Sequence, residues 1–247
     1  MAGALVLVSG EKGGVGKSFV AASLVDWVWH RLDHPVVVIE CNAEIPDVGR
    51  RFTGDIPVYA IEVRREGGWA RFADIAAEHP DAIIIANLPG FVEQAFPQDR
   101  AAIVNAIRVT QDIPVILAWV LSAERDSILA LRREVELLQQ PIKDVVAILN
   151  EFHGQLADFE WLTSNSRAEY SGAIEIVLPK LWSVAAKVLK NPEALSYAEI
   201  RSLKTSVKVS AGMRLTLRDY LRRTDLVWEA FGREFGWLTD AVADHAR

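Results

Sequence analysis

The chain has 247 residues, a formal net charge of −6, 51% hydrophobic residues and 24% charged residues. This apolar content excludes an intrinsically disordered chain, and the length suits a single α/β domain over residues 1–247. The one cysteine, Cys41, excludes an internal disulfide framework and any zinc or iron–sulfur site made by several thiolates of one chain. No apolar run approaches the roughly 20 residues that span a bilayer, and the first residues lack the cationic region of a signal peptide, so we expect a soluble, cytoplasmic protein.

Apolar, β-rich runs alternate along the chain with segments of helical period. The runs predict strands over residues 4–9, 36–41, 58–63, 82–87, 115–121, 145–150 and 174–178. The periodic segments predict helices over 17–32, 69–79, 98–110 and 123–139, and a helical C-terminal part over 183–247. Because the strands are apolar throughout, both faces of their sheet are expected to be covered. The sequence therefore predicts an α/β fold, a mostly parallel, twisted sheet flanked by helices.

A glycine-rich segment, SGEKGGVGKS at residues 9–18, follows the first predicted strand and opens the first predicted helix. Its glycines allow backbone N–H groups to surround a polyphosphate without a Cβ in the way, and the helix start adds its positive dipole end. Lys17 is expected to reach the β- and γ-phosphates and the Ser18 hydroxyl to ligate Mg²⁺. This context favours a phosphate-binding loop over a flexible glycine turn.

Two residues distinguish this loop from the common phosphate-loop pattern. Glu11 stands where that pattern has its first glycine, and a second lysine, Lys12, follows it. The KGGVGKS form resembles the deviant Walker loop of the ParA/MinD family of dimeric ATPases, and the similarity extends more loosely over residues 1–182. The resemblance implies a SIMIBI-like P-loop NTPase fold, ATP and Mg²⁺ as ligands, and an ATP-dependent homodimer in which Lys12 contacts the partner's phosphates. The loop residues expected to bind ATP are Glu11, Lys12, Gly13, Gly14, Val15, Gly16, Lys17, Ser18 and Phe19.

Two later positions resemble the adenine side of the family's site. Asn150 ends the predicted strand over 145–150, as does the family's asparagine that hydrogen-bonds the adenine; a polar cap at a strand end is the alternative. Pro179 follows the next strand and resembles the family's apolar-Pro segment beside the adenine. The resemblance therefore makes Asn150 and Pro179 candidates for contact with the base.

The acidic residues of the family's site are partly missing. Family members usually end the second strand with Asp-x-Asp, whereas this strand ends in Glu40-Cys41-Asn42, and Asn42 cannot carry negative charge. The aspartate expected on the strand over 82–87 aligns with Ala86, next to Asn87.

Candidate catalytic residues are accordingly Lys12, Lys17, Glu40 and Asn42, and candidate metal ligands are Ser18 and Glu40. Loss of one positioned charge commonly costs about 10²–10³ in rate, so we expect slow or absent ATP hydrolysis. Glu44 or Asp47, in the loop after the second strand, could compensate.

Basic residues gather in the C-terminal part. Residues 180–223 contain ten lysines and arginines against three acids, a charge of +7, so the rest of the chain carries −13. Clustered cations bind phosphate backbones without reading sequence, and ParA-type proteins bind DNA through a basic C-terminal surface, so nonspecific DNA is the expected partner. Helical spacing selects Arg218, Arg222 and Arg223 as candidate DNA-binding residues; a solvated helix face is the alternative. Residues 224–247 carry −3 and an apolar set with helical spacing, which predicts packing on the domain and no membrane binding.

The predicted function is an ATP-binding, dimerising switch of the ParA/MinD type that acts in plasmid or DNA partition, positioning or transfer. Such a switch implies a regulatory partner protein that resets it, and association with the nucleoid if the chain binds DNA. Two alternatives remain open: a non-catalytic, nucleotide-gated scaffold, and another enzyme of the same P-loop superfamily.

Overall fold

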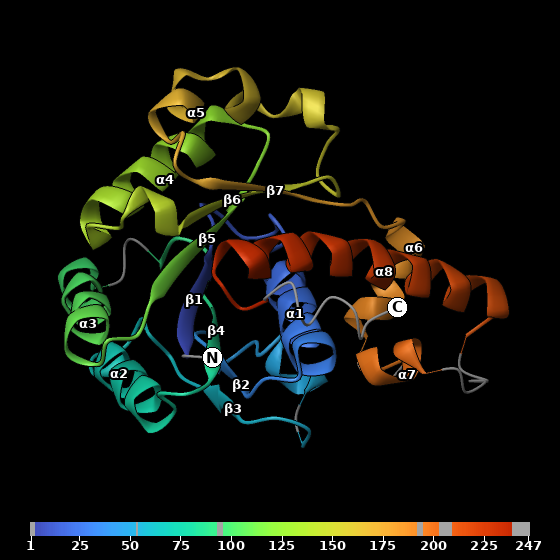
Figure 1. Cartoon of the computed structure of the whole chain (residues 1–247), viewed down its shortest axis with the longest axis horizontal. Helices are drawn as coiled ribbons and strands as arrows, with labels where there is room; N and C mark the ends of the chain where they lie inside the picture. Colours follow the sequence, from blue (N-terminus) through green and yellow to red (C-terminus); the bar gives the residue numbers. More distant parts are fainter. Residues whose placement is uncertain (1–2, 53, 93–95, 192–194, 203–208, 239–247) are drawn as a thin grey trace.

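A seven-stranded, all-parallel sheet forms the centre of the computed structural model, which describes residues 3–52, 54–92, 96–191, 195–202 and 209–238 (Figure 1). The strands are β1 (Ala4–Ser9), β2 (Val36–Glu40), β3 (Val58–Ala60), β4 (Ile83–Asn87), β5 (Val115–Leu121), β6 (Val145–Asn150) and β7 (Ile174–Leu178). Their order across the sheet is β3-β2-β4-β1-β5-β6-β7. The carboxyl ends of β1, β2 and β4 therefore meet at one edge, where the glycine-rich loop leaves β1.

Helices cover both faces of this sheet. They are α1 (Lys17–Trp27), α2 (Gly68–Glu78), α3 (Pro97–Thr110), α4 (Arg125–Leu138), α5 (Asn165–Glu169), α6 (Ser183–Lys190), α7 (Tyr197–Arg201) and α8 (Ala211–Glu234). A π-helical turn, η1 (Val28–Leu32), continues α1, and short 3₁₀ turns lie at Gly49–Arg51 (η2), Ile142–Asp144 (η4), Leu156–Asp158 (η5) and Glu160–Thr163 (η6). In Figure 1, α1, α6, α7 and α8 lie on one side of the sheet and α2, α3 and α4 on the other.

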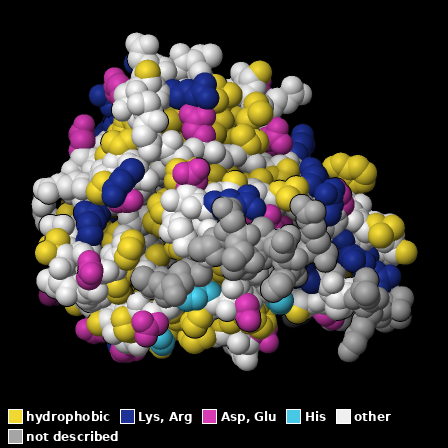
Figure 2. Space-filling model, viewed as in Figure 1, with side chains coloured by type: hydrophobic (Ala, Val, Ile, Leu, Met, Phe, Trp, Pro, Cys, Tyr) yellow, Lys and Arg dark blue, Asp and Glu magenta, His cyan; other side chains and the backbone are white. Residues whose placement is uncertain are grey.

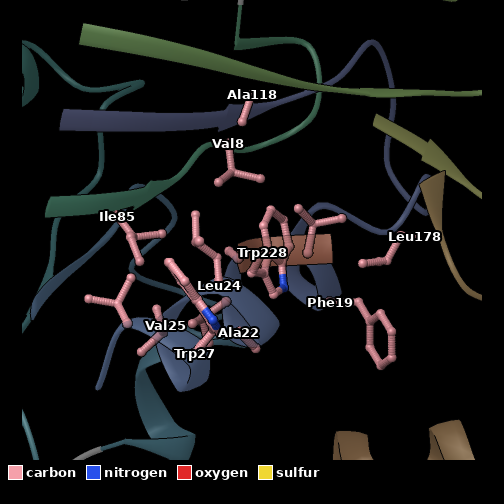
Figure 3. Packing of buried hydrophobic residues seen from close by; sticks show 14 of the residues in the cluster. Val8, Phe19, Ala22, Leu24, Val25, Trp27, Ile85, Ala118, Leu178 and Trp228 are labelled. Carbon is pink, nitrogen blue, oxygen red and sulfur yellow. The ribbon is translucent and has the colours of Figure 1, made fainter. Parts of the chain in front are cut away.

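Two apolar layers result, because successive residues of a strand face opposite sides of the sheet. Along β1, Val6 and Val8 pack into the layer under α1 and α8, whereas Leu5 and Leu7 pack into the layer under α2, α3 and α4. Figure 3 shows the first layer, in which Trp228 from α8 meets α1 beneath the sheet. The predicted α/β sheet with both faces covered is confirmed.

Element boundaries differ from the predictions mainly at the sheet edges and in the C-terminal part. The edge strand β3 ends at Ala60 instead of residue 63, and β7 is only half-buried. In the described residues of the C-terminal part, the structure has the separate helices α6, α7 and α8 instead of one continuous helical segment. Ser196 and Ser210 cap the starts of α7 and α8, each accepting a backbone N–H from three residues ahead. Within the described residues, no helix is long and apolar enough to cross a bilayer.

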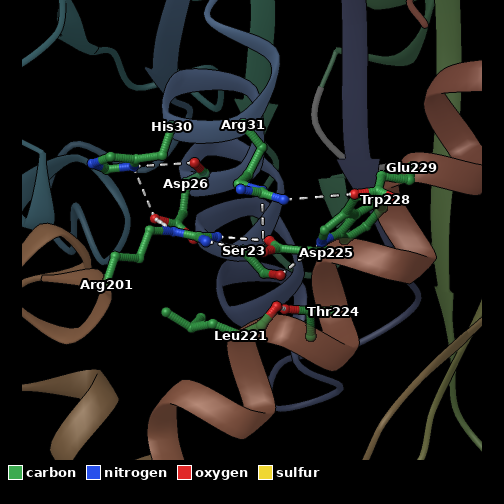
Figure 4. A network of polar contacts seen from close by, with 10 residues as sticks. All are labelled: Ser23, Asp26, His30, Arg31, Arg201, Leu221, Thr224, Asp225, Trp228 and Glu229. Atoms are coloured by element: carbon green, nitrogen blue, oxygen red, sulfur yellow. Dashed lines mark hydrogen bonds and ion pairs between the residues drawn. The ribbon is translucent and has the colours of Figure 1, made fainter. Parts of the chain in front are cut away.

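A buried polar network attaches the C-terminal helices to α1 (Figure 4). Arg201 donates to Asp225 Oδ1 at 2.7 Å and, through Nε, to Asp26 Oδ1 at 3.0 Å. Trp228 Nε1 donates to Ser23 Oγ at 2.7 Å on the same helix, α1. The apolar set predicted to pack on the domain is Leu226, Trp228, Phe231, Phe235, Leu238 and Val242. Trp228 and Phe231 are each 1% exposed and confirm the packing, whereas the prediction is wrong for Leu226, which is 57% exposed; Val242 lies outside the described residues.

Candidate nucleotide-binding site

Glycines shape the loop between β1 and α1. Gly14 and Gly16 have φ angles of 85° and 101°, in the left-handed region that other residues seldom adopt. A Cβ on Gly16 would also collide with the Asn150 amide, and one on Gly90 would lie 2.7 Å from the backbone nitrogen of Gly13. Tight packing from two sides therefore holds the loop backbone in one curved path at the start of α1.

Lys17 lies inside this curve. It opens α1, is 7% exposed, and its Nζ donates to the Lys12 carbonyl oxygen at 2.7 Å. A lysine held against its own loop at a helix start places a cation and the positive end of the helix dipole at one point. This is the arrangement that the sequence predicts for contact with phosphate.

Three polar side chains meet beside the loop, from α1, β2 and β4. The Asn87 Nδ2 donates to Glu40 Oε2 at 2.9 Å and lies 3.3 Å from Ser18 Oγ. The sequence-based alignment put Ala86 at this position, which is wrong: Ala86 faces the opposite apolar layer. The parallel register pairs Asn87 with both Val8 and Glu40, so the alternation along β4 turns Asn87 toward the loop.

Glu40 is fully buried and engaged on both oxygens. Its Oε1 accepts the backbone N–H groups of Val48 and Gly49, the latter at 2.7 Å, and its Oε2 accepts from Asn87. Burial raises the pKa of this carboxyl, while the three hydrogen bonds act in the opposite direction. Glu40 thus anchors the start of η2 to the end of β2.

The sequence predicts Mg²⁺ bound between Ser18 and Glu40. The hydrogen bonds of these side chains do not fit that prediction. Magnesium requires oxygen lone pairs arranged octahedrally, whereas an amide N–H faces Ser18 and both Glu40 oxygens accept N–H groups. An aspartate at position 87 would offer an acceptor where Asn87 offers a donor.

A cavity of about 490 Å³ opens in front of these residues. It brings together the predicted residues Gly13, Gly14, Gly16, Lys17, Ser18, Phe19 and Asn42. Among the residues that the structure describes, five cationic side chains line it, Lys17, Arg50, Arg51, Arg64 and Lys190, against one carboxylate, Asp47. Such a cavity favours a strongly anionic ligand.

The two acids considered as compensating residues differ in position. Asp47 lines the cavity but bonds Arg50 at 2.8 Å. Glu44 is highly exposed and pairs with Arg65 at 4.0 Å. Asp47 is therefore the one of the two that faces the site.

Four of the cavity's cations, Arg50, Arg51, Arg64 and Lys190, are not among the residues that the sequence predicts for the nucleotide site, although Lys190 belongs to the basic segment 180–223. Arg64 follows β3 and donates to the Gly90 carbonyl at 2.9 Å, and Arg51 donates to the Leu189 carbonyl at 2.7 Å. Lys190 ends α6 and lies 5.7 Å from the centre of the Phe152 ring. No local motif marks these residues, because the turn of the chain after β2 and the docking of α6 bring them together.

The adenine-side candidates, Asn150 and Pro179, are not among the residues that line this cavity. Asn150 is 1% exposed, and its Nδ2 donates to the Val15 carbonyl at 3.3 Å while its Oδ1 accepts the Phe152 N–H at 3.2 Å. The first contact ties the end of β6 to the glycine-rich loop, and the second closes the turn that follows β6. Pro179 is half-buried, directly after β7.

Lys12 lies on the outer side of the loop. Its ammonium pairs with Glu124, which precedes α4, and this contact raises the pKa of Lys12. Neighbouring Glu11 is half-buried, and its carbonyl accepts the Phe91 N–H at 3.2 Å. Lys12 is thus a partly exposed cation held within its own chain.

The basic C-terminal segment is partly neutralised. Arg201 is used in the buried network, and Arg222 and Arg223 both pair with Asp219 at 3.0 Å. Arg218 is exposed and, with Arg222, lines a second hollow between η1 and α8. Lys204 and Lys208 lie outside the described residues. Figure 2 shows basic side chains at the right-hand side of the molecule, over α6 and α8, beside hydrophobic ones.

The fold and the loop define a protein with the P-loop NTPase fold. The chain is similar to the nucleotide-binding protein of Archaeoglobus fulgidus, solved in complex with ADP, with a TM-score of 0.51 and 14% identity over 81% of this chain and 92% of that chain. FtsY from Mycoplasma mycoides gives a TM-score of 0.49 and 10% identity over 89% of this chain and 68% of that chain.

Among curated sequences, the chain is 26% identical over 160 residues to Protein MobD of Acidithiobacillus ferrooxidans, which covers 65% of this chain and 69% of that protein. No protein-family model matches the chain. The resemblance to ParA/MinD-type P-loop proteins is confirmed at the level of the fold.

Proposed function

We propose that this chain is an ATP-binding switch of the ParA/MinD type, which dimerises around nucleotide and acts in the partition, positioning or transfer of plasmid or other DNA. The observation that carries the proposal is the cavity in which the glycine-rich loop, Lys17 and four further cations surround one opening. A nucleoside polyphosphate supplies the negative charge that this lining lacks. The assignment to DNA processes comes from the family resemblance of the loop.

The dimerisation part of the proposal is supported by the resemblance of Lys12 to the family's second loop lysine. The family resemblance gives this lysine to the partner's phosphates, and in the single chain it is held by Glu124 instead. Exchange of Glu124 for a phosphate gives a contact that exists only in the nucleotide-bound dimer, and a ligand shifts an equilibrium through such differential contacts. Hydrolysis is expected to be slow or absent, because Asn42 and Asn87 stand where carboxylates are expected.

Size-exclusion chromatography with light scattering tests the switch, with ATP, ADP or no nucleotide. The dimer is expected with ATP alone, and Lys12→Ala is expected to stay monomeric while still binding ATP. Glu124→Gln is the matched variant, because it releases Lys12 without removing it and should keep or strengthen the dimer. A wild-type chain that binds ATP and remains monomeric leaves the nucleotide-gated scaffold as the better description.

A further inference from the structure

The charges around the nucleotide cavity are out of balance in one direction. Within the described part of the chain, five cations line it, and the one carboxylate of the lining, Asp47, bonds Arg50. Without a ligand, mutual repulsion among these cations opposes their gathering. A highly charged anion that neutralises all of them is therefore expected to gain more binding free energy in this cavity than an anion of lower charge.

Arg51 and Arg64 are held in place by groups that carry no net charge. The Arg64 guanidinium donates to the Gly90 carbonyl, and Gly90 itself packs against Gly13 of the loop. Arg51 donates to the carbonyls of Asp47 and Leu189, at 2.9 and 2.7 Å. A carbonyl oxygen orients a guanidinium but leaves its charge available, and the planar fork then suits bidentate contact with phosphate.

The place where a divalent cation is expected, between Ser18 and Glu40, offers hydrogen-bond donors instead of free acceptor oxygens. The Ser18 hydroxyl faces the Asn87 N–H, and Glu40 accepts three N–H donors. Turning the Asn87 amide to offer its oxygen would direct that oxygen, instead of the N–H, at the Glu40 carboxylate. Offering an acceptor at Ser18 thus costs the hydrogen bond that satisfies Glu40.

We propose that this cavity binds its nucleoside triphosphate as the metal-free polyanion, with Arg51, Arg64 and Lys190 neutralising the phosphate charge that Mg²⁺ neutralises in other P-loop sites. The inference rests on the proposed function, since it concerns the same cavity and the same class of ligand. It assigns to three residues outside the phosphate loop a direct role in ATP binding. It also explains why a site with amides at positions 42 and 87 can still hold ATP.

The first test uses the wild-type protein and a fluorescent ATP analogue, titrated with excess Mg²⁺ or with EDTA at matched ionic strength. The dissociation constants are expected to agree within about threefold, less than 1 kcal/mol. Binding more than about tenfold weaker in EDTA overturns the inference while leaving the proposed function intact. Failure to bind under either condition overturns the proposed function itself.

The second test compares two neighbouring arginines. Arg64→Gln removes a cation from the cavity, whereas Arg65→Gln removes one that lies outside the cavity lining and pairs with Glu44. Loss of one charge-assisted contact is expected to weaken ATP binding in EDTA by about tenfold for Arg64→Gln and to leave Arg65→Gln unchanged. Equal effects of the two variants contradict the assignment.

The third test restores the acceptor next to Ser18. Asn87→Asp is expected to make ATP binding depend on Mg²⁺, whereas Asn42→Asp, which adds the same charge elsewhere in the cavity, should weaken binding about equally with Mg²⁺ and with EDTA. Thermal unfolding of both variants checks that they fold. Equal Mg²⁺ dependence in the two folded variants overturns the role given to Asn87, and the wild-type comparison stands whichever variant folds.

Discussion

Arginines serve two different purposes on the two sides of α1. In the network with α7 and α8, Arg201 bonds two buried carboxylates, Asp26 and Asp225. In the cavity at the start of α1, Arg51 and Arg64 bond backbone carbonyls. Arg201 is neutralised by two carboxylates and holds α7 and α8 against α1. Arg51 and Arg64 are oriented by carbonyls, and no carboxylate of the described residues forms an ion pair with either of them. The comparison indicates that the partners of a buried or half-buried arginine, carboxylates or carbonyls, decide how much of its charge remains available to a ligand.

The largest expected effect comes from removing Arg201, the arginine that pairs with two buried carboxylates. Arg201→Met leaves Asp26 and Asp225 buried without their cation, which is expected to lower the free energy of unfolding by about 3–5 kcal/mol. Urea denaturation measures the effect. Arg222→Met is the control, because its pair with Asp219 is exposed and should contribute less than about 1 kcal/mol. Similar losses for both variants would show that the buried network carries no special weight.

The cavity side of the comparison is tested by Lys17→Ala. Loss of the cation closest to the β- and γ-phosphates is expected to weaken ATP binding by about a hundredfold or more. Isothermal titration calorimetry measures the affinity. Near-normal binding by a folded Lys17→Ala protein would refute the assignment of the phosphate loop.

The surface of α8 lies between these two cases, since Arg222 and Arg223 share Asp219 while Arg218 is exposed. Replacement of all three arginines by Glu should weaken binding to every DNA sequence by about tenfold or more at low salt, because fewer counterions are released. ATP binding should be unaffected. Gel-shift titrations with several sequences and salt concentrations test this, and unchanged DNA affinity would remove this surface as the contact.

An exposed ion pair should give the smallest effect and a defined pH dependence. The hydrogen bond from Arg167 lowers the pKa of Glu175 below its ordinary value of 4.5, so the folded state favours the ionised carboxylate. The stabilisation is present above that ordinary value and is lost as the pH falls through the lower pKa of the folded state. Arg167→Gln should therefore lower the stability slightly at neutral pH and by less in acid. Urea midpoints at both pH values measure this, and a constant difference would contradict the linkage.

The local features of this protein could be predicted from its sequence. Continuous apolar runs located all seven strands, and SGEKGGVGKS at residues 9–18 located the loop, because glycine conformations and strand burial depend on neighbouring residues. Trp27, Trp119 and Trp228 lie in predicted helices or strands and are buried, whereas Trp182 is 71% exposed.

Only the tertiary structure decided which side chains meet at the site. The register of β4 turns Asn87 toward Ser18, whereas Ala86 faces the other side of the sheet. A shift of one position along a strand moves a side chain to the opposite face, so the sequence-based alignment chose the wrong residue. The docking of α6 brings Lys190 to the cavity lined by the glycine-rich loop, which is far away in sequence. The Asn150 amide donates to the Val15 carbonyl of the same loop. Local chemistry thus determined the strands and the phosphate loop, whereas the charge balance of the cavity depended on contacts between segments that no local pattern connects.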